Sequence, residues 1–169
     1  IQERYSRTAF VTHPPADASF FKPDNRDENG GYFLIVSRLV PYKRIDVAVK
    51  AFNASGLPLK IAGQGSEYKS LKKMAAANVE LLGYVESREA VRELYRGCRA
   101  FIMPQEEDWG IAGVEAQACG KPVIAYAKGG ALEYVIEGAS GHFFREQSPD
   151  SLLKAVKEFE TLSFDAIKI

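Results

Sequence analysis

Short apolar runs alternate with stretches of helical periodicity from Tyr32 to the end of the chain. The apolar runs have the length of strands and cover residues 32–36, 57–62, 79–82, 100–103, 122–127 and 141–144. They are apolar nearly throughout, which is typical of strands that are buried on both faces.

Between these runs, apolar residues recur at the three- and four-residue spacing of an α-helix. The clearest sets are Ile45, Ala48, Val49 and Phe52; Ala90, Val91, Leu94 and Tyr95; and Leu152, Leu153, Val156 and Phe159. The last set follows Ser148-Pro149, an expected N-cap with a proline at the first helical position. The alternation predicts an α/β fold, a Rossmann-like parallel sheet with helices on both faces.

The first 31 residues lack this alternation. His13-Pro14-Pro15 favours extended backbone, and the charged stretch 22–31 ends in glycines, as loops do. We therefore expect a domain boundary near residues 13–31, with one domain over residues 32–169. The chain begins without methionine and stops abruptly, so we expect a piece of a longer protein.

Composition narrows the class of protein. The 169 residues suit one domain, and 22 basic residues balance 22 acidic ones, which gives no reason to expect a nucleic-acid partner. Cys98 and Cys119 lie in apolar segments without CxxC spacing, which predicts buried thiols in a reducing compartment. No apolar run approaches the roughly 18 residues of a membrane span. We therefore expect a cytoplasmic protein.

Ligands of such sheets bind beyond the carboxyl ends of the strands, so the loops there are informative. Arg38 and Lys43 flank the turn after the first predicted strand and are suited to hold phosphate oxygens at a helix start. The alternative is a solvated basic loop. Residues 63–66, Gly-Gln-Gly-Ser, open a helix, but Tyr68 breaks the dinucleotide fingerprint. A tight turn capped by Ser66 is the simpler interpretation.

Two further loops carry candidate chemistry. After the third strand, the backbone near Tyr84 and Val85 could read a nucleotide base, or it could be a plain turn with Ser87 as N-cap. After the fourth strand, acidic residues and Trp109 precede a helix that begins near Gly110, and we expect Ile111, Val114 and Ala118 on its buried face.

The spacing of the acidic residues directs Glu107 and Glu115 to one crevice, where carboxylates accept hydrogen bonds from sugar hydroxyls. The alternative is a solvated acidic loop, with Glu115 stabilising the start of the helix. We find no constellation of residues with metal-ligand spacing and expect no metal and no resident cofactor.

The ordered set of motifs resembles the retaining glycosyltransferases of family four. The motifs are Ser-Arg-Leu-x-x-x-Lys from Ser37, the Gly-x-Gly turn, Leu-Gly-Tyr-Val from residue 82, Glu107-x7-Glu115, Gly-Lys-Pro-Val-Ile-Ala from residue 120, and Gly-Gly-Ala-Leu-Glu from residue 129 with Glu-Gly-x-x-Gly from residue 137. The form Glu-Glu-Asp-Trp-Gly-Ile looks most like mannosyltransferases that use GDP-mannose.

This resemblance implies the C-terminal half of a GT-B fold. Residues 1–31 would be the interdomain linker and the end of a missing N-terminal domain, and residues 32–169 would form the nucleotide-sugar-binding domain. The resemblance also implies a role for each site residue. Arg38 and Lys43 would hold the donor diphosphate, and Glu115 would bind the ribose. Glu107 would hold the donor sugar together with the backbone of Trp109, Gly110, Ile111 and Ala112. The base would lie near Gly63, Tyr84 and Val85.

The implied activity is transfer of a hexosyl group from a nucleoside-diphosphate sugar to an acceptor hydroxyl, with retention of configuration. A glycan or lipid-linked acceptor would bind the missing N-terminal domain, and only that domain would contact a membrane surface. The chain would therefore be inactive alone. The alternatives are a sugar-nucleotide epimerase, a glycogen-synthase-like enzyme, a non-catalytic sugar-nucleotide sensor and an NAD-binding domain.

Overall fold

The computed structural model describes residues 2–23, 30–166 and 169. A six-stranded sheet lies at its centre, with all neighbouring strands parallel. The strands are β1 (Tyr32–Val36), β2 (Leu59–Ala62), β3 (Val79–Gly83), β4 (Cys98–Met103), β5 (Val123–Tyr126) and β6 (Gly141–Phe144). The predicted α/β fold and its parallel sheet are confirmed.

The strand order is β3-β2-β1-β4-β5-β6. The chain builds outward from β1 to β3 and then returns to place β4 on the other side of β1. The loops after β1 and β4 therefore lead in opposite directions and leave a crevice between them, which is where doubly wound sheets bind ligands.

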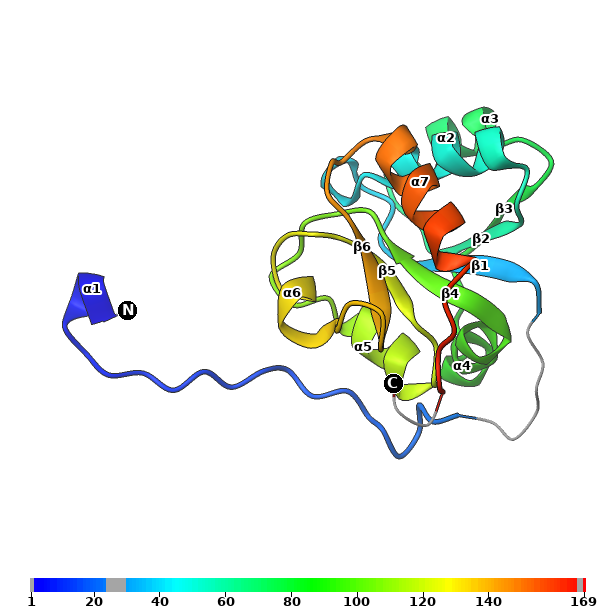
Figure 1. Cartoon of the computed structure of the whole chain (residues 1–169). Coiled ribbons are helices and arrows are strands. Elements are labelled where there is room, and N and C mark those ends of the chain that lie inside the picture. The colour runs from blue at the N-terminus through cyan, green and yellow to red at the C-terminus, as the bar shows by residue number, and fades with distance from the viewer. Residues whose placement is uncertain (1, 24–29, 167–168) are drawn as a thin grey trace.

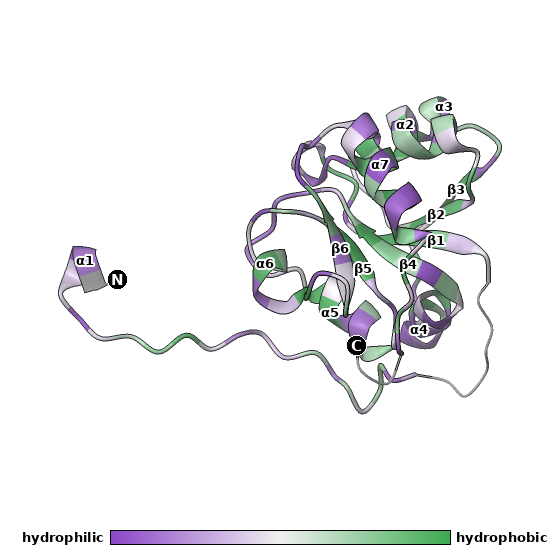
Figure 2. Cartoon of the chain, viewed as in Figure 1, coloured by the Kyte–Doolittle hydropathy of each residue, from purple (hydrophilic) through white to green (hydrophobic). Residues whose placement is uncertain are grey.

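Helices cover both faces of this sheet (Figure 1). On one face lie α2 (Ile45–Ser55), α3 (Tyr68–Met74) and α7 (Pro149–Phe159), and on the other lie α4 (Arg88–Gly97) and α5 (Ile111–Ala118). The buried side chains form one cluster on each face, and the strands between them are apolar (Figure 2). Two short elements complete the domain, the 3-10 helix η1 (Pro41–Lys43) and α6 (Ala131–Tyr134).

The predicted helix starts are partly confirmed. The Ser148 hydroxyl accepts a hydrogen bond from the Ser151 amide at the start of α7, and Ser87 caps α4 in the same way. The cap predicted for Ser66 is wrong, because α3 begins at Tyr68 without a side-chain cap.

The buried face predicted for α5 is confirmed only for Ala118, which packs against the core, and is wrong for Ile111. Gly113, Ala116 and Gln117 face the interior, whereas Ile111 is 45% exposed. A Cβ atom on Gly113 would lie 2.3 Å from the Tyr134 hydroxyl and 2.6 Å from the Met103 sulfur. The helix therefore approaches the sheet through its small residues, and this leaves Ile111 at the crevice.

The glycines of the Gly-x-Gly turn permit close backbone packing. A Cβ atom on Gly63, whose φ is +142°, would lie 1.8 Å from the Ser37 carbonyl oxygen, and one on Gly65 would lie 2.2 Å from that of Leu39. The loop after β2 thus rests directly on the loop after β1. This contact explains both glycines without a dinucleotide.

The segment before β1 includes α1 (Gln2–Tyr5) and an extended stretch that leads away from the domain (Figure 1). Phe21 anchors the near end of this segment, since it is 4% exposed and its ring contacts Tyr95 edge-on at 5.8 Å. Residues 24–29 of the predicted loop lie outside the described residues. The predicted domain boundary near residue 31 agrees with the start of β1 and stays a prediction.

Cys98 and Cys119 are buried and unpaired, as predicted. Burial raises the pKa of the Cys98 thiol to about 12 and that of Cys119 to about 11, so both remain protonated at neutral pH.

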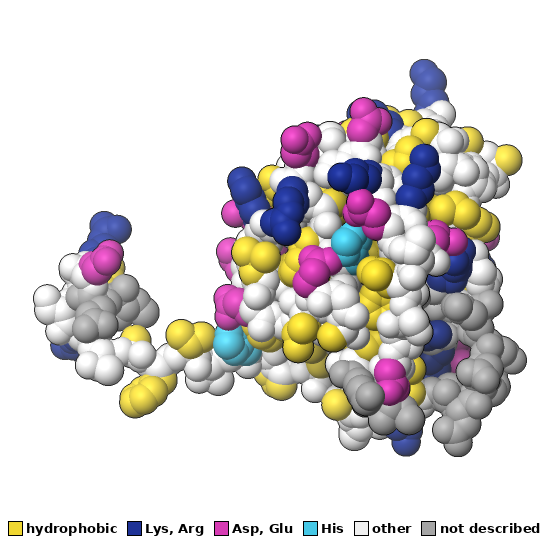
Figure 3. Space-filling model, in the orientation of Figure 1, with side chains coloured by type: hydrophobic (Ala, Val, Ile, Leu, Met, Phe, Trp, Pro, Cys, Tyr) yellow, Lys and Arg dark blue, Asp and Glu magenta, His cyan; other side chains and the backbone are white. Residues whose placement is uncertain are grey.

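Acidic and basic side chains are interspersed on the face shown in Figure 3. Within residues 2–23 and 30–166, no helix is long and apolar enough to cross a membrane.

Candidate functional site

Two adjoining cavities open at the carboxyl ends of β1, β2, β3 and β4. One, of about 360 Å³, is lined by the loop after β4 and the start of α5, and we call it the α5 cavity. The other, of about 420 Å³, is lined by the loops after β2 and β3, and we call it the β3 cavity. Val36, Ser37 and Arg38 line both, so the two cavities meet at the end of β1.

The structure brings the residues predicted from the sequence together at these cavities. The β3 cavity is lined by Gly63, Tyr84 and Val85, and the α5 cavity by Lys43, Glu107, Trp109, Gly110, Ile111 and Ala112, with Arg38 at the junction. Glu115 is the exception, because it lines neither the α5 cavity nor the β3 cavity. It lies one turn into α5, behind the residues that form the rim.

The two cations differ in their surroundings. Arg38 is exposed, and its side chain has no ion-pair partner among the residues that the structure describes. Lys43 forms an ion pair with Glu107, and their side chains are only 12% and 22% exposed. The α5 cavity thus contains a neutralised, partly buried pair, and Arg38 contributes an uncompensated positive charge beside it.

Glu107 is held by contacts that the sequence did not predict. Gln105, which is 7% exposed, donates a hydrogen bond of 3.1 Å to the same carboxylate oxygen that Lys43 contacts. The Gly130 amide donates to the Glu107 carbonyl at 2.7 Å, and a Cβ atom on Gly129 would lie 2.3 Å from that oxygen. The glycine pair after β5 therefore fixes the loop that carries Glu107.

Trp109 contacts the segment before β1 through an aromatic stack. The His13 ring lies 4.1 Å from the indole with an interplanar angle of 17°, and its Nε2 contacts Glu133 at 2.7 Å. Tyr134 packs on the indole at 5.3 Å, and Pro14 lines the α5 cavity. The sequence suggested only a linker role for His13, because His13 and Trp109 are far apart in the sequence and only the fold brings them together.

Glu115 lies between α5 and α4. It is half-buried, and its Oε2 accepts a hydrogen bond of 3.0 Å from the hydroxyl of Tyr95. Burial raises the pKa of this carboxyl, and the hydrogen bond from Tyr95 opposes that shift. The same helix α4 contributes Val91 to the β3 cavity.

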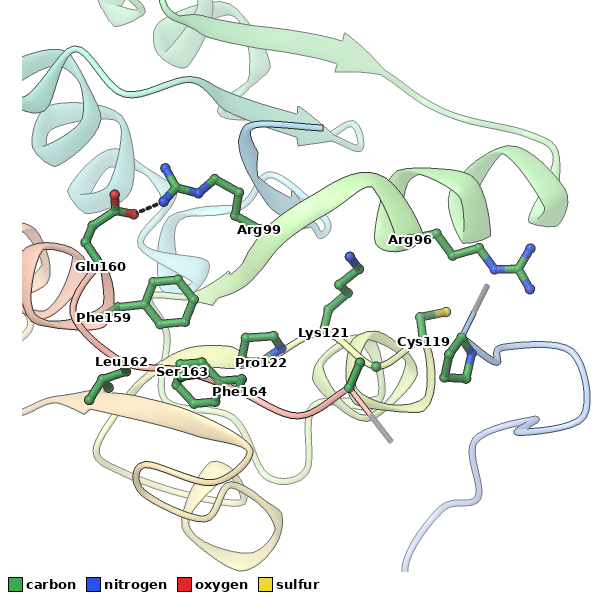
Figure 4. Close-up of a pocket in the computed structure, with 13 residues that line it drawn as sticks. Arg96, Arg99, Cys119, Lys121, Pro122, Phe159, Glu160, Leu162, Ser163 and Phe164 are labelled. Carbon is green, nitrogen blue, oxygen red and sulfur yellow. Dashed lines mark ion pairs between the residues drawn. The ribbon is translucent and has the colours of Figure 1, made fainter. Parts of the chain in front are cut away.

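A third cavity, of about 410 Å³, lies at the opposite ends of the strands. Arg99 at the start of β4 and Lys121 before β5 line it, and Arg99 pairs with Glu160 (Figure 4). None of the residues predicted for the site lies there. Among the described residues, no group of three histidine, cysteine or acidic side chains could hold a metal ion.

Comparison with known proteins supplies the context for this site. Residues 17–166 match the family model of glycosyl transferases group 1. The chain is 34% identical over 137 residues to an uncharacterized glycosyltransferase of Methanocaldococcus jannaschii, with 78% of this chain and 38% of that protein covered. It thus spans less than half the length of this relative.

Solved structures share the fold. The C-terminal domain of a group 1 glycosyl transferase from Francisella tularensis matches with a TM-score of 0.74 and 14% identity, over 87% of this chain and 88% of that one. The Anabaena protein HepE, solved with UDP and glucose, matches with a TM-score of 0.74 and 22% identity, over 86% of this chain and 45% of that one.

The stack of His13 on Trp109 leads to a prediction. Because Trp109 is the only tryptophan of the chain, tryptophan fluorescence reports the surroundings of this one indole. His13→Ala should uncover the indole, shift its emission to longer wavelength and increase quenching by iodide. The matched control is His142→Ala, since that imidazole contacts Glu137 and Glu158 instead. Identical spectra for His13→Ala and the unsubstituted chain would show that the segment before β1 does not cover Trp109.

Proposed function

The chain belongs to the group 1 glycosyltransferases and has the fold of their C-terminal GT-B domain, and from this premise we propose that it binds the sugar-nucleotide donor of a retaining hexosyltransferase. The observation that carries the proposal is the pair of joined cavities with Arg38 at their junction. Each cavity has a volume typical of small-molecule sites. Together they suit an elongated ligand whose negative charge lies near its middle, as in a nucleoside-diphosphate sugar.

We assign one part of the donor to each region. The base would occupy the β3 cavity beside Gly63, Tyr84 and Val85, and the ribose would contact Glu115. The diphosphate would lie at the junction between Arg38 and Lys43. The sugar would occupy the α5 cavity, where Glu107 and the backbone of residues 109–112 contact it.

The charges explain how this arrangement would promote transfer. As the bond between the sugar and the diphosphate breaks, negative charge grows on the departing phosphate, and fixed cations there stabilise the transition state. The amino end of α5 opens onto the same cavity and adds the positive end of its dipole.

Lys43 has a second role in this account. Lys43 forms an ion pair with Glu107, and an arriving diphosphate would attract Lys43 away from that carboxylate. Glu107 would then be free to accept hydrogen bonds from the sugar and to favour positive charge at the anomeric carbon. In this account the positive charge beside the diphosphate comes from side chains and from the start of α5.

The acceptor lies outside this domain in our proposal. A glycan or lipid-linked hydroxyl would bind to an N-terminal domain, which would also provide any contact with a membrane surface. Residues 1–31 would then be the interdomain linker, and the chain alone would bind donor without transferring sugar. In the complete protein we propose a cytoplasmic location.

The finer proposal is that the donor is GDP-mannose. It rests on residues 106–111, whose Glu-Glu-Asp-Trp-Gly-Ile form resembles that of mannosyltransferases, whereas the Anabaena relative was solved with UDP and glucose. We expect GDP and GDP-mannose to raise the melting temperature of the chain more than UDP, ADP or their sugars, because ligands that bind only the folded state stabilise it. A larger shift with UDP-glucose would contradict the mannosyl proposal, and no shift with any of them would contradict donor binding.

Arg38 and Lys43 should act on the diphosphate alone. Arg38→Ala and Lys43→Ala should each weaken binding of the nucleoside diphosphate about tenfold to a hundredfold, since a charge-assisted hydrogen bond contributes about 1.5–3 kcal/mol. Binding of the nucleoside should hardly change. Calorimetry with both ligands measures this, and Lys154→Ala is the control, because that exposed lysine lies on α7. Equal losses for nucleoside and diphosphate would mean that the two cations have structural roles only.

The two glutamates should differ in the ligands that they affect. Glu115→Gln should weaken binding of both the nucleoside diphosphate and the sugar nucleotide, because both contain the ribose. Glu107→Gln should weaken only the sugar nucleotide. Glu106→Gln is the control, since that neighbouring carboxylate is exposed and lines neither cavity. If Glu107→Gln harmed diphosphate binding as much as Glu115→Gln, the separate ribose and sugar roles would be wrong.

A further inference from the structure

Tyr95 has a hydroxyl that its packing does not require. The residue is fully buried, and its ring contacts Phe101 at 5.6 Å and Phe21 at 5.8 Å. A phenylalanine ring would make the same contacts without carrying a polar group into the core. A buried hydroxyl is costly unless it has a partner, so the partner of this one indicates what the hydroxyl is for.

That partner is the carboxylate of Glu115. The Tyr95 hydroxyl donates to Oε2 at 3.0 Å across the contact between α4 and α5. The other oxygen, Oε1, has no hydrogen-bond partner among the residues that the structure describes. The carboxylate is thus fixed through one oxygen and keeps the other for a ligand.

The charge state of Glu115 depends on the same contact. Burial disfavours the ionised carboxylate and raises its pKa, while Tyr95 and, more weakly, Arg88 of α4 lower it. The other titratable groups close to Tyr95 and Glu115 are Cys119 and Cys98, whose buried thiols stay protonated at neutral pH. Tyr95 is therefore the main group that favours the ionised form.

We propose that Tyr95 is a positioning residue for donor binding, which holds Glu115 so that its free oxygen accepts hydrogen bonds from the ribose hydroxyls. This inference rests on the proposed function, since it assumes that Glu115 meets the ribose. It adds a residue that cannot touch the donor, because no part of its side chain reaches the surface. The specificity for a ribose would thus be built from α4 as well as α5.

The test compares Tyr95→Phe with the unsubstituted chain in calorimetric titrations with GDP and UDP across a range of pH. Tyr95→Phe should weaken nucleoside-diphosphate binding about tenfold at neutral pH, through loss of a hydrogen bond to a charged group. It should also move the acid limb of binding to higher pH. The sign follows from the pKa, because loss of a donor to the ionised carboxylate raises the pKa, and protonation then begins at higher pH.

A double-mutant cycle separates positioning from simple support of the fold. In a Glu115→Gln background, Tyr95→Phe should cause no further loss of affinity and no shift of the acid limb, because the two residues act as one unit. Tyr126→Phe is the matched control. It removes a hydroxyl from another buried tyrosine, which packs on Phe144 and has no contact with Glu115.

The outcomes distinguish this inference from the function on which it rests. If Glu115→Gln weakens binding but Tyr95→Phe changes neither affinity nor the acid limb, the positioning role is wrong and the donor site stands. If Tyr95→Phe lowers affinity equally with and without Glu115, its role is structural and the inference is again wrong. Failure of the unsubstituted chain to bind any nucleoside diphosphate would overturn both proposals.

Discussion

The return of the chain from β3 to β4 beside β1 is the constraint on which the site depends. Because β4 pairs with β1 on the side opposite β2, the loops after these strands diverge and leave the crevice unfilled. Arg38 follows β1, Glu107 follows β4, and Gly63 follows β2. No two of these residues are close in the sequence, and only the strand order brings them to adjoining cavities.

Close packing of backbone on backbone keeps that crevice in shape. Gly63 and Gly65 let one loop rest on the carbonyl groups of another, and Gly129 and Gly130 do the same for the loop that carries Glu107. Gly113 lets α5 approach Met103 and Tyr134. Side chains at these positions would push the walls apart, so the glycines position the charged groups without touching a ligand.

The sequence predicted the sheet well because buried parallel strands have an unmistakable apolar pattern. β1 and β6 begin and end where the apolar runs do, and ten of the eleven predicted site residues line the two cavities beyond the carboxyl ends of the strands. The face of α5 was predicted wrongly, because apolarity suggested Ile111 while close approach to the sheet required Gly113. The contacts of His13 with Trp109, of Gln105 with Glu107 and of Tyr95 with Glu115 depend on tertiary packing, which periodicity does not report.

The central claim is that the diphosphate of a sugar nucleotide lies where the two cavities meet. A crystal structure of the chain with the nucleoside diphosphate that stabilises it most would test this directly. The account predicts phosphate oxygens within hydrogen-bond distance of Arg38 and Lys43, and a ribose hydroxyl donating to Glu115. A diphosphate bound at the opposite ends of the strands, beside Arg99 and Lys121, would contradict it.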